Sequence, residues 1–261
     1  MKDNIATKIW SVVYPLGMYY VTVCVALYVA QLFFGQGEES YMTCQILSSL
    51  VALPVLYQFY RQDKIWEGTA GKKVKIEKAH IFSVIYAVVA AVLIGFALNN
   101  IIYMTPLVEM SQGFQEANQN FYGSTLYMEL LGSAIITPLL EELLYRGIIY
   151  KRMEKMTGFL PALLVSSFIF AFMHFNLVQF IYAFLLGVVL AYMMHDKGHM
   201  YVAAAGHMGA NALAVIRTEF GLFENFADGR PMAWIVSVLC LLLGILVLFL
   251  GREKKEQKTV K

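Results

Sequence analysis

The sequence LYMELLGSAIITPLLEELLYRGIIY, from Leu126 to Tyr150, is the stretch that decides the nature of this protein. It is long and apolar enough to cross a membrane, yet it contains Glu141, Glu142 and Arg146. A charged side chain near the centre of a bilayer costs roughly 2.5–3.5 kcal/mol on insertion scales. Three of them in neighbouring helical turns therefore indicate a functional site.

The rest of the chain has the composition of an integral membrane protein. Of its 261 residues, 59% are hydrophobic and 15% are charged, whereas a soluble domain has roughly 25% charged residues. A formal net charge of +2 gives no indication of a nucleic-acid partner. Cys24, Cys44 and Cys240 lie in apolar segments without metal-ligand spacing, so they predict neither a disulfide framework nor a metal site.

Apolar runs predict an all-α fold, a polytopic bundle of about eight transmembrane helices. A hydrocarbon core of ~30 Å needs about 20 apolar residues per helix. The expected spans are residues 9–34, 41–60, 80–104, 124–150, 158–175, 177–194, 201–217 and 231–250. We expect one integrated domain with three parts: an N-terminal three-helix region (1–125), a helix core with the charged span (126–217), and a last helix with a basic tail (218–261).

Lysine and arginine predict the orientation of these spans. Of the 20 such residues, 17 fall in the termini and alternate loops that share one side, and the loops of the other side contain only Arg230. By the positive-inside rule both termini are cytoplasmic, which requires an even number of spans. The protein is therefore expected in the cell membrane.

The two glutamates of the charged span differ in their expected partners. Glu142 and Arg146 are four residues apart and share a helix face in the favourable order, so they are expected to form an ion pair. Glu141 points about 100° away and has no such partner nearby, which suits a general base. A purely structural role for both glutamates, bound to Arg146 or to another helix, remains the alternative.

Two later spans add polar groups with complementary chemistry. His174 follows Phe170 by four residues, and His207 precedes Asn211 by four. Each could be a satisfied core residue, and Asn often links membrane helices. Together, however, a carboxylate and an imidazole can take a proton from water, while imidazole and amide N–H groups can stabilise an oxyanion. The set fits water-activated amide hydrolysis best.

The motifs Glu141-Glu142-x-x-x-Arg146, Phe170-x-x-x-His174 and His207-x-x-x-Asn211, in this order, resemble those of the CPBP family of intramembrane proteases. That family includes the type II CAAX prenyl endopeptidases and the bacterial Abi proteins, and the resemblance covers about residues 127–216. It implies that Glu141 and His174 hold the attacking water and that His207 and Asn211 form the oxyanion site. Glu142, Arg146 and Phe170 would support them. The implied partner is a membrane-associated peptide or protein substrate, prenylated at a CAAX motif in some members.

The sequence leaves the metal question open. Glu141, His174 and His207 would supply the three protein ligands of a hydrolytic zinc site. Because HExxH is absent and Asn is a poor zinc ligand, we expect no cofactor, with zinc as the alternative. His195 and His199 lie in a short turn and are interpreted as interfacial residues.

Depth along the helices predicts a cavity that faces the cytoplasm. At ~1.5 Å per residue, Glu141 lies about 15 Å from Lys151, and His207 about 15 Å from Lys197. His174 would lie about 24 Å from the same surface, which requires a tilted or more deeply placed helix.

Two other functions compete with hydrolysis. The buried Glu, Arg and His residues could form the relay of a membrane transporter, although no paired repeat with interrupted helices is visible. The chain could also be a non-catalytic bacteriocin-immunity protein, in which case substituting Glu141 would leave the phenotype intact.

Overall fold

The structure is a computed structural model that describes residues 4–71 and 78–252. All regular structure within these residues is helical, which confirms the all-α bundle. The expected basic groups at Lys2, within residues 72–77 and in the tail 253–261 lie outside the described residues.

Most of the helices follow the apolar runs of the sequence. The N-terminal region contains three long helices, α1 (Ile5–Phe34), α2 (Glu38–Trp66) and α3 (Lys78–Tyr103), and then two short ones, α4 (Leu107–Met110) and α5 (Gln112–Phe121). The C-terminal part contains α9 (Phe159–Phe172), α10 (Leu177–Lys197), α11 (Met200–Phe220), the 3₁₀ turn η3 (Glu224–Phe226) and α12 (Pro231–Leu250). Among the described residues, five helices are long and apolar enough to cross a membrane: α1, α2, α3, α10 and α12. The count of eight spans therefore stays a prediction.

The charged span forms one helical segment that changes its winding four times. It consists of α6 (Leu126–Glu129), the π-helix η1 (Leu130–Ile136), α7 (Thr137–Glu142), the π-helix η2 (Leu143–Tyr150) and α8 (Lys151–Thr157). The residues at the joins keep right-handed helical angles, so the backbone is not broken. Pro138 lacks a backbone N–H and cannot continue the regular hydrogen-bond ladder. The π-helical turns on either side of Glu141 and Glu142 were not expected from the sequence.

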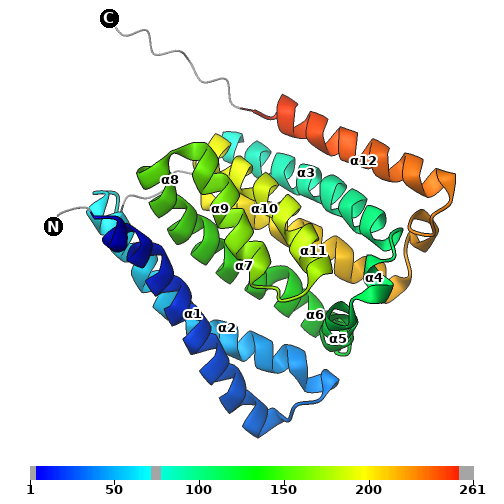
Figure 1. Ribbon diagram of the computed structural model, residues 1–261, viewed down its shortest axis with the longest axis horizontal. Helices are drawn as coiled ribbons and strands as arrows, with labels where there is room; N and C mark the ends of the chain where they lie inside the picture. Colours follow the sequence, from blue (N-terminus) through cyan, green and yellow to red (C-terminus); the bar gives the residue numbers. More distant parts are fainter. Residues whose placement is uncertain (1–3, 72–77, 253–261) are drawn as a thin grey trace, which may run out of the picture.

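Small residues bring α11 close to α3. A Cβ atom on Gly206 would lie 3.1 Å from the carbonyl oxygen of Ala87, and one on Gly209 would lie 2.9 Å from Cγ1 of Val88. Half of the alanine and glycine residues of α11 are buried, and none of them is exposed, in line with the interior position that the sequence predicts for this helix. On its other side α3 packs against α12, so it lies between the two (Figure 1).

Lysine and arginine residues gather at one end of the bundle, which we call the basic end. The beginning of α1, α8 and the end of α12 lie there, whereas α4, α5 and the beginning of α6 lie at the opposite end (Figure 1). Arg152 joins three helices at the basic end. Its guanidinium binds the carboxylate of Asp63 at 2.8 and 2.9 Å and the carbonyl oxygen of Ser11 at 2.5 Å. Lys155 binds Glu67 at 2.6 Å nearby.

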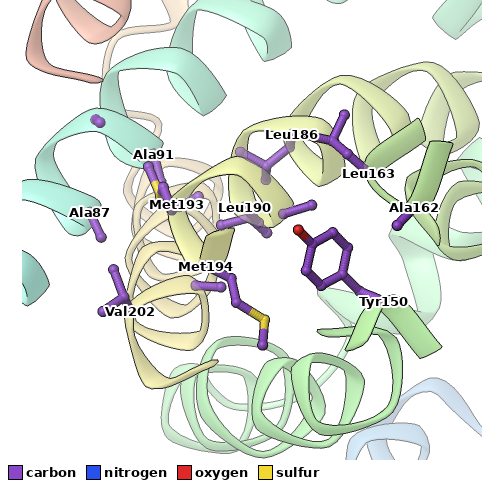
Figure 2. Packing of buried hydrophobic residues seen from close by; sticks show 14 residues of the cluster. Ala87, Ala91, Tyr150, Ala162, Leu163, Leu186, Leu190, Met193, Met194 and Val202 are labelled. Carbon is purple, nitrogen blue, oxygen red and sulfur yellow. The ribbon is translucent and has the colours of Figure 1, made fainter. Parts of the chain in front are cut away.

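A cluster of buried apolar side chains fills the interior next to the basic end. It joins α3, η2, α9, α10 and α11, and Figure 2 shows its members packed between these helices. We call it the basic-end core; its larger members are Tyr150, Leu163, Leu186, Leu190, Met193, Met194 and Val202. Each of these side chains is at most 5% exposed. No polar passage is therefore expected through this part of the protein.

The close contact between α11 and α3 makes Gly206 sensitive to any added side chain. We expect Gly206→Leu to lower the free energy of unfolding by roughly 1–3 kcal/mol, because the new atoms meet the backbone of α3. Thermal unfolding of the purified protein in detergent measures this change. Gly17→Leu is the matched control, because a Cβ on Gly17 of α1 has no neighbour within 4 Å. Equal melting temperatures for the two variants would contradict the close packing.

Candidate active site

A cavity of about 600 Å³ lies inside the bundle, and it contains the polar residues that the sequence singles out. Glu141, His174, His207 and Asn211 all line it. They come from α7, from the turn after α9 and from α11. Side chains that are up to 70 residues apart in the sequence thus face one common space.

Glu142 is the centre of a fully buried network of charges. Its Oε1 lies 3.1 Å from Nη1 of Arg146, so the ion pair expected from their spacing is present. The same oxygen lies 2.9 Å from Nδ1 of His207. Neither the Glu142 nor the Arg146 side chain has any exposed surface. Buried charges of this kind are tolerated only when they are paired and hydrogen-bonded.

Arg146 has two further contacts that hold it in place. Its Nη2 donates to the carbonyl oxygen of Gly187 on α10 at 3.0 Å. Its guanidinium carbon lies 4.6 Å from the centre of the Phe170 ring, a cation–π contact. Gly187 permits this approach, because a Cβ there would lie 3.2 Å from Nη2 of Arg146 and 3.1 Å from the Phe170 ring. The pair therefore also positions α9 and α10.

The contact with Glu142 fixes how His207 presents its ring. A carboxylate only accepts hydrogen bonds, so Nδ1 of His207 carries the hydrogen. The other nitrogen, Nε2, lies 3.8 Å from Oε2 of Glu141. The Glu141 side chain is 18% exposed, in contrast to the fully buried Glu142. Sequence reasoning missed the bond between Glu142 and His207, because the two residues are 65 positions apart.

His174 lies on a turn, not inside a membrane helix. The expected span 158–175 is too long at its end: α9 stops at Phe172, and α10 begins with Asn176 as its N-cap, which accepts from the backbone N–H of Gln179 at 2.8 Å. Nδ1 of His174 lies 3.0 Å from the carbonyl oxygen of Phe170 and must donate to it. In the neutral ring, Nε2 is then free of hydrogen and can accept a proton.

Phe170 brings the two imidazoles to the same place. Its ring centre lies 5.1 Å from that of His174 and 5.7 Å from that of His207, with an edge-to-face arrangement in both cases. Phe170 itself is 2% exposed and also lines the cavity. Its position explains why an apolar residue belongs to the motif.

Asn211 lies one helical turn beyond His207 on α11. Its Nδ2 donates to the carbonyl oxygen of Ser133 in η1 at 2.9 Å. An amide nitrogen carries two hydrogens, so one remains for a ligand in the cavity. The π-helical stretch thus supplies the carbonyl group that orients this amide.

The described side chains do not gather as the ligands of a metal ion. Within residues 4–71 and 78–252, no three His, Cys, Asp or Glu residues are arranged to hold one. His174 and His207 each direct Nδ1 to another group, which leaves Nε2 of each ring available as a metal ligand, so the alternative zinc set with Glu141 stays a prediction. His195, at the basic end, contacts the Glu154 carboxylate at 2.7 Å.

The cavity opens in the direction opposite to the one expected. The sequence predicts an opening towards the lysine- and arginine-rich surface. In the structure the cavity continues from Glu141 and His207 towards the other end of the bundle, where Tyr103, Asn118 and Thr218 line it. The residue-by-residue depth could not show on which side of the site the helices separate.

Comparisons with known proteins agree with the motif residues. Residues 123–213 match the model of the family described as "Type II CAAX prenyl endopeptidase Rce1-like". The chain is also 30% identical over 87 residues to the "Putative membrane peptidase YdiL" of Bacillus subtilis (strain 168). That match covers 33% of this chain and 36% of the relative's length. No solved structure matches the chain significantly.

The matched segment contains all seven motif residues, from Glu141 to Asn211. It lies in a chain with several helices apolar enough to cross a membrane. This chain is a multi-pass integral membrane protein, and the match over residues 123–213 confirms its resemblance to the CPBP family, which includes the type II CAAX prenyl endopeptidases.

Proposed function

We propose that this protein is an intramembrane endopeptidase that hydrolyses a peptide bond of a membrane-associated substrate with a side-chain-activated water. One observation carries the proposal: Glu141, His174, His207 and Asn211 line the same cavity of about 600 Å³. The family match and the peptidase relative support it. A prenylated CAAX-type segment is one candidate substrate.

Glu141 and His174 activate the water in this proposal. Glu141 is the carboxylate that faces the cavity, and Nε2 of His174 is a hydrogen acceptor because Nδ1 donates to Phe170. A water held between them loses a proton to one of the two groups as its oxygen bonds to the carbonyl carbon. The proton then passes to the amine as the C–N bond breaks, which leaves a carboxylate and an amine.

His207 and Asn211 stabilise the tetrahedral intermediate. Its oxyanion accepts hydrogen bonds from Nε2–H of His207 and from the second Nδ2 hydrogen of Asn211. Because Nδ1–H of His207 donates to Glu142, the ring carries a hydrogen on both nitrogens in this step, and the contact with Glu142 holds it in place. Glu142 is thus a positioning residue, and Arg146 compensates its charge in the hydrocarbon region.

The proposal predicts that Glu141→Gln abolishes proteolysis while the protein still inserts and folds. General acid–base groups contribute about 10²–10⁴-fold to the rate, and a loss of this size is expected. Mass spectrometry of membrane-associated peptides from cells with wild-type protein or Glu141→Gln measures the products and the cut site.

Glu116→Gln is the matched control, because Glu116 lies on α5 and forms its hydrogen bond with Gln112, away from the cavity. Products that persist in Glu141→Gln cells would contradict the proposal and favour a non-catalytic protein. Uptake or efflux by purified protein in liposomes, without a peptide product, would favour the transporter.

Asn211 is expected to act on the rate of the chemical step. Loss of one oxyanion donor lowers kcat by about 10²–10³-fold, and Asn211→Ala should show this with little change in KM. Asn118→Ala is the control: its amide lines the outer part of the cavity and donates to the Tyr103 hydroxyl at 3.3 Å, so it should change KM only. Equal kcat values for wild type and Asn211→Ala would assign Asn211 to helix packing.

Side-chain activation of water also predicts activity without a bound metal. Purified protein treated with a chelator should keep its rate of cleavage, and its zinc content should be far below one atom per chain. Elemental analysis of the Glu141→Gln variant provides a readout that does not depend on activity. Stoichiometric zinc in wild type, lost together with activity and restored by zinc alone, would establish the zinc alternative.

A further inference from the structure

On each helix that lines the cavity, the lining residues lie in the part of the helix away from the basic end. On the charged span its lining residues are Ser133, Thr137 and Glu141, and among the described residues none follows Glu141 on that span. On α11 the lining begins at His207 and continues to Thr218. Glu141 and His207 therefore form the floor of the cavity. The other lining residues of the charged span and of α11 lie on the side away from the basic end.

The space beyond this floor is filled. Four members of the basic-end core come after the cavity lining on their helices or before it on α11, towards the basic end: Tyr150 on η2, Leu190 and Met194 on α10, and Val202 on α11. Figure 2 shows these four side chains packed together. All four are at most 3% exposed. Buried apolar packing of this kind excludes water and peptide from that side.

At the other end the cavity reaches the protein surface. Tyr103 at the end of α3 is 44% exposed, and Thr218, Glu224 and Asp228 at the end of α11 and in the loop after it are also exposed. Asn118 of α5 completes this opening. We call it the mouth of the cavity. The short helix α5 before the charged span therefore forms part of the entrance to the site.

The distribution of charge assigns the two ends to the two sides of the membrane. Within the described residues, the basic end has Lys8, Arg61, Lys64, Lys151, Arg152, Lys155, Lys197 and Arg252. The opposite end has Arg217 and Arg230, together with several carboxylates such as Glu224 and Asp228. The positive-inside rule places the basic end in the cytoplasm, and so the mouth faces the extracytoplasmic side.

We infer that the site takes its substrate from the extracytoplasmic side, and that this substrate is a polypeptide segment exposed there or in the outer leaflet. The inference rests on the proposed proteolysis for the nature of the substrate, but not for the direction of access. It makes a segment of an exported peptide or of a membrane protein the expected substrate class. A prenylated protein that stays in the cytoplasm would meet the filled end of the bundle.

Two threonines at opposite ends provide a matched test of the direction. Thr218 lines the mouth, and Thr157 is the last residue of α8 at the basic end; both are exposed. In a protein with Cys24, Cys44 and Cys240 replaced by alanine, Thr218→Cys or Thr157→Cys provides the single thiol. Intact cells are treated with a membrane-impermeant maleimide, and the labelling is compared with that of permeabilised cells.

We expect Thr218→Cys to be labelled equally in intact and permeabilised cells, and Thr157→Cys only after permeabilisation. The reverse pattern would overturn the inference and leave the proposed proteolysis standing. Labelling of both residues in intact cells would overturn it as well, because the two ends would then not lie on opposite sides.

A second measurement connects access with turnover. A bulky impermeant maleimide on Thr218→Cys should stop formation of the peptide products in intact cells, relative to the unlabelled Thr218→Cys protein. The same treatment of Thr157→Cys cells should leave product formation unchanged. Continued turnover with the mouth blocked would overturn the inference. The absence of products in wild-type cells would instead refute the proposed proteolysis, while the labelling pattern would still decide the direction of the cavity.

Discussion

The need to neutralise charge in an apolar interior is the constraint on which this structure depends. Arg146 and Glu142 have no exposed surface, so each requires a partner within hydrogen-bond distance. Their mutual contact satisfies this need only in part. The remaining contacts, to His207 and to the carbonyl oxygen of Gly187, come from α11 and α10. The contacts of one buried ion pair therefore link three segments of the bundle.

The two adjacent glutamates show how environment separates chemical roles. Glu142 is fully buried and contacts Arg146 and His207, so in the proposed reaction it acts through His207. Glu141, one residue earlier, faces the cavity and remains 18% exposed. Neighbouring helix positions point about 100° apart, which allows one glutamate to face the interior and the other the cavity. In the proposed reaction Glu141, and not Glu142, holds the water together with His174.

Much of this arrangement follows from the sequence because it is local. The apolar runs predicted most of the helices, and the spacing of four residues predicted the contact between Glu142 and Arg146. The small residues of α11 predicted its buried position next to other helices. The predicted end of the span 158–175 lies three residues beyond the end of α9, because hydropathy does not distinguish a helix from a turn at Met173–Phe175. The π-helical turns were also not predicted, because hydropathy and side-chain spacing do not distinguish π-helical from α-helical hydrogen bonding.

The sequence by itself determined that the chain crosses the membrane as a helical bundle and which polar side chains it contains there, because hydropathy and helix periodicity are properties of short segments. Only the tertiary structure decided that His207 bonds to Glu142, that the Phe170 ring contacts both imidazoles, and that the cavity opens away from the basic end. These features depend on the rotation and tilt of whole helices. Those are set by the sum of contacts such as Gly206 against Ala87, and no spacing within one helix specifies them.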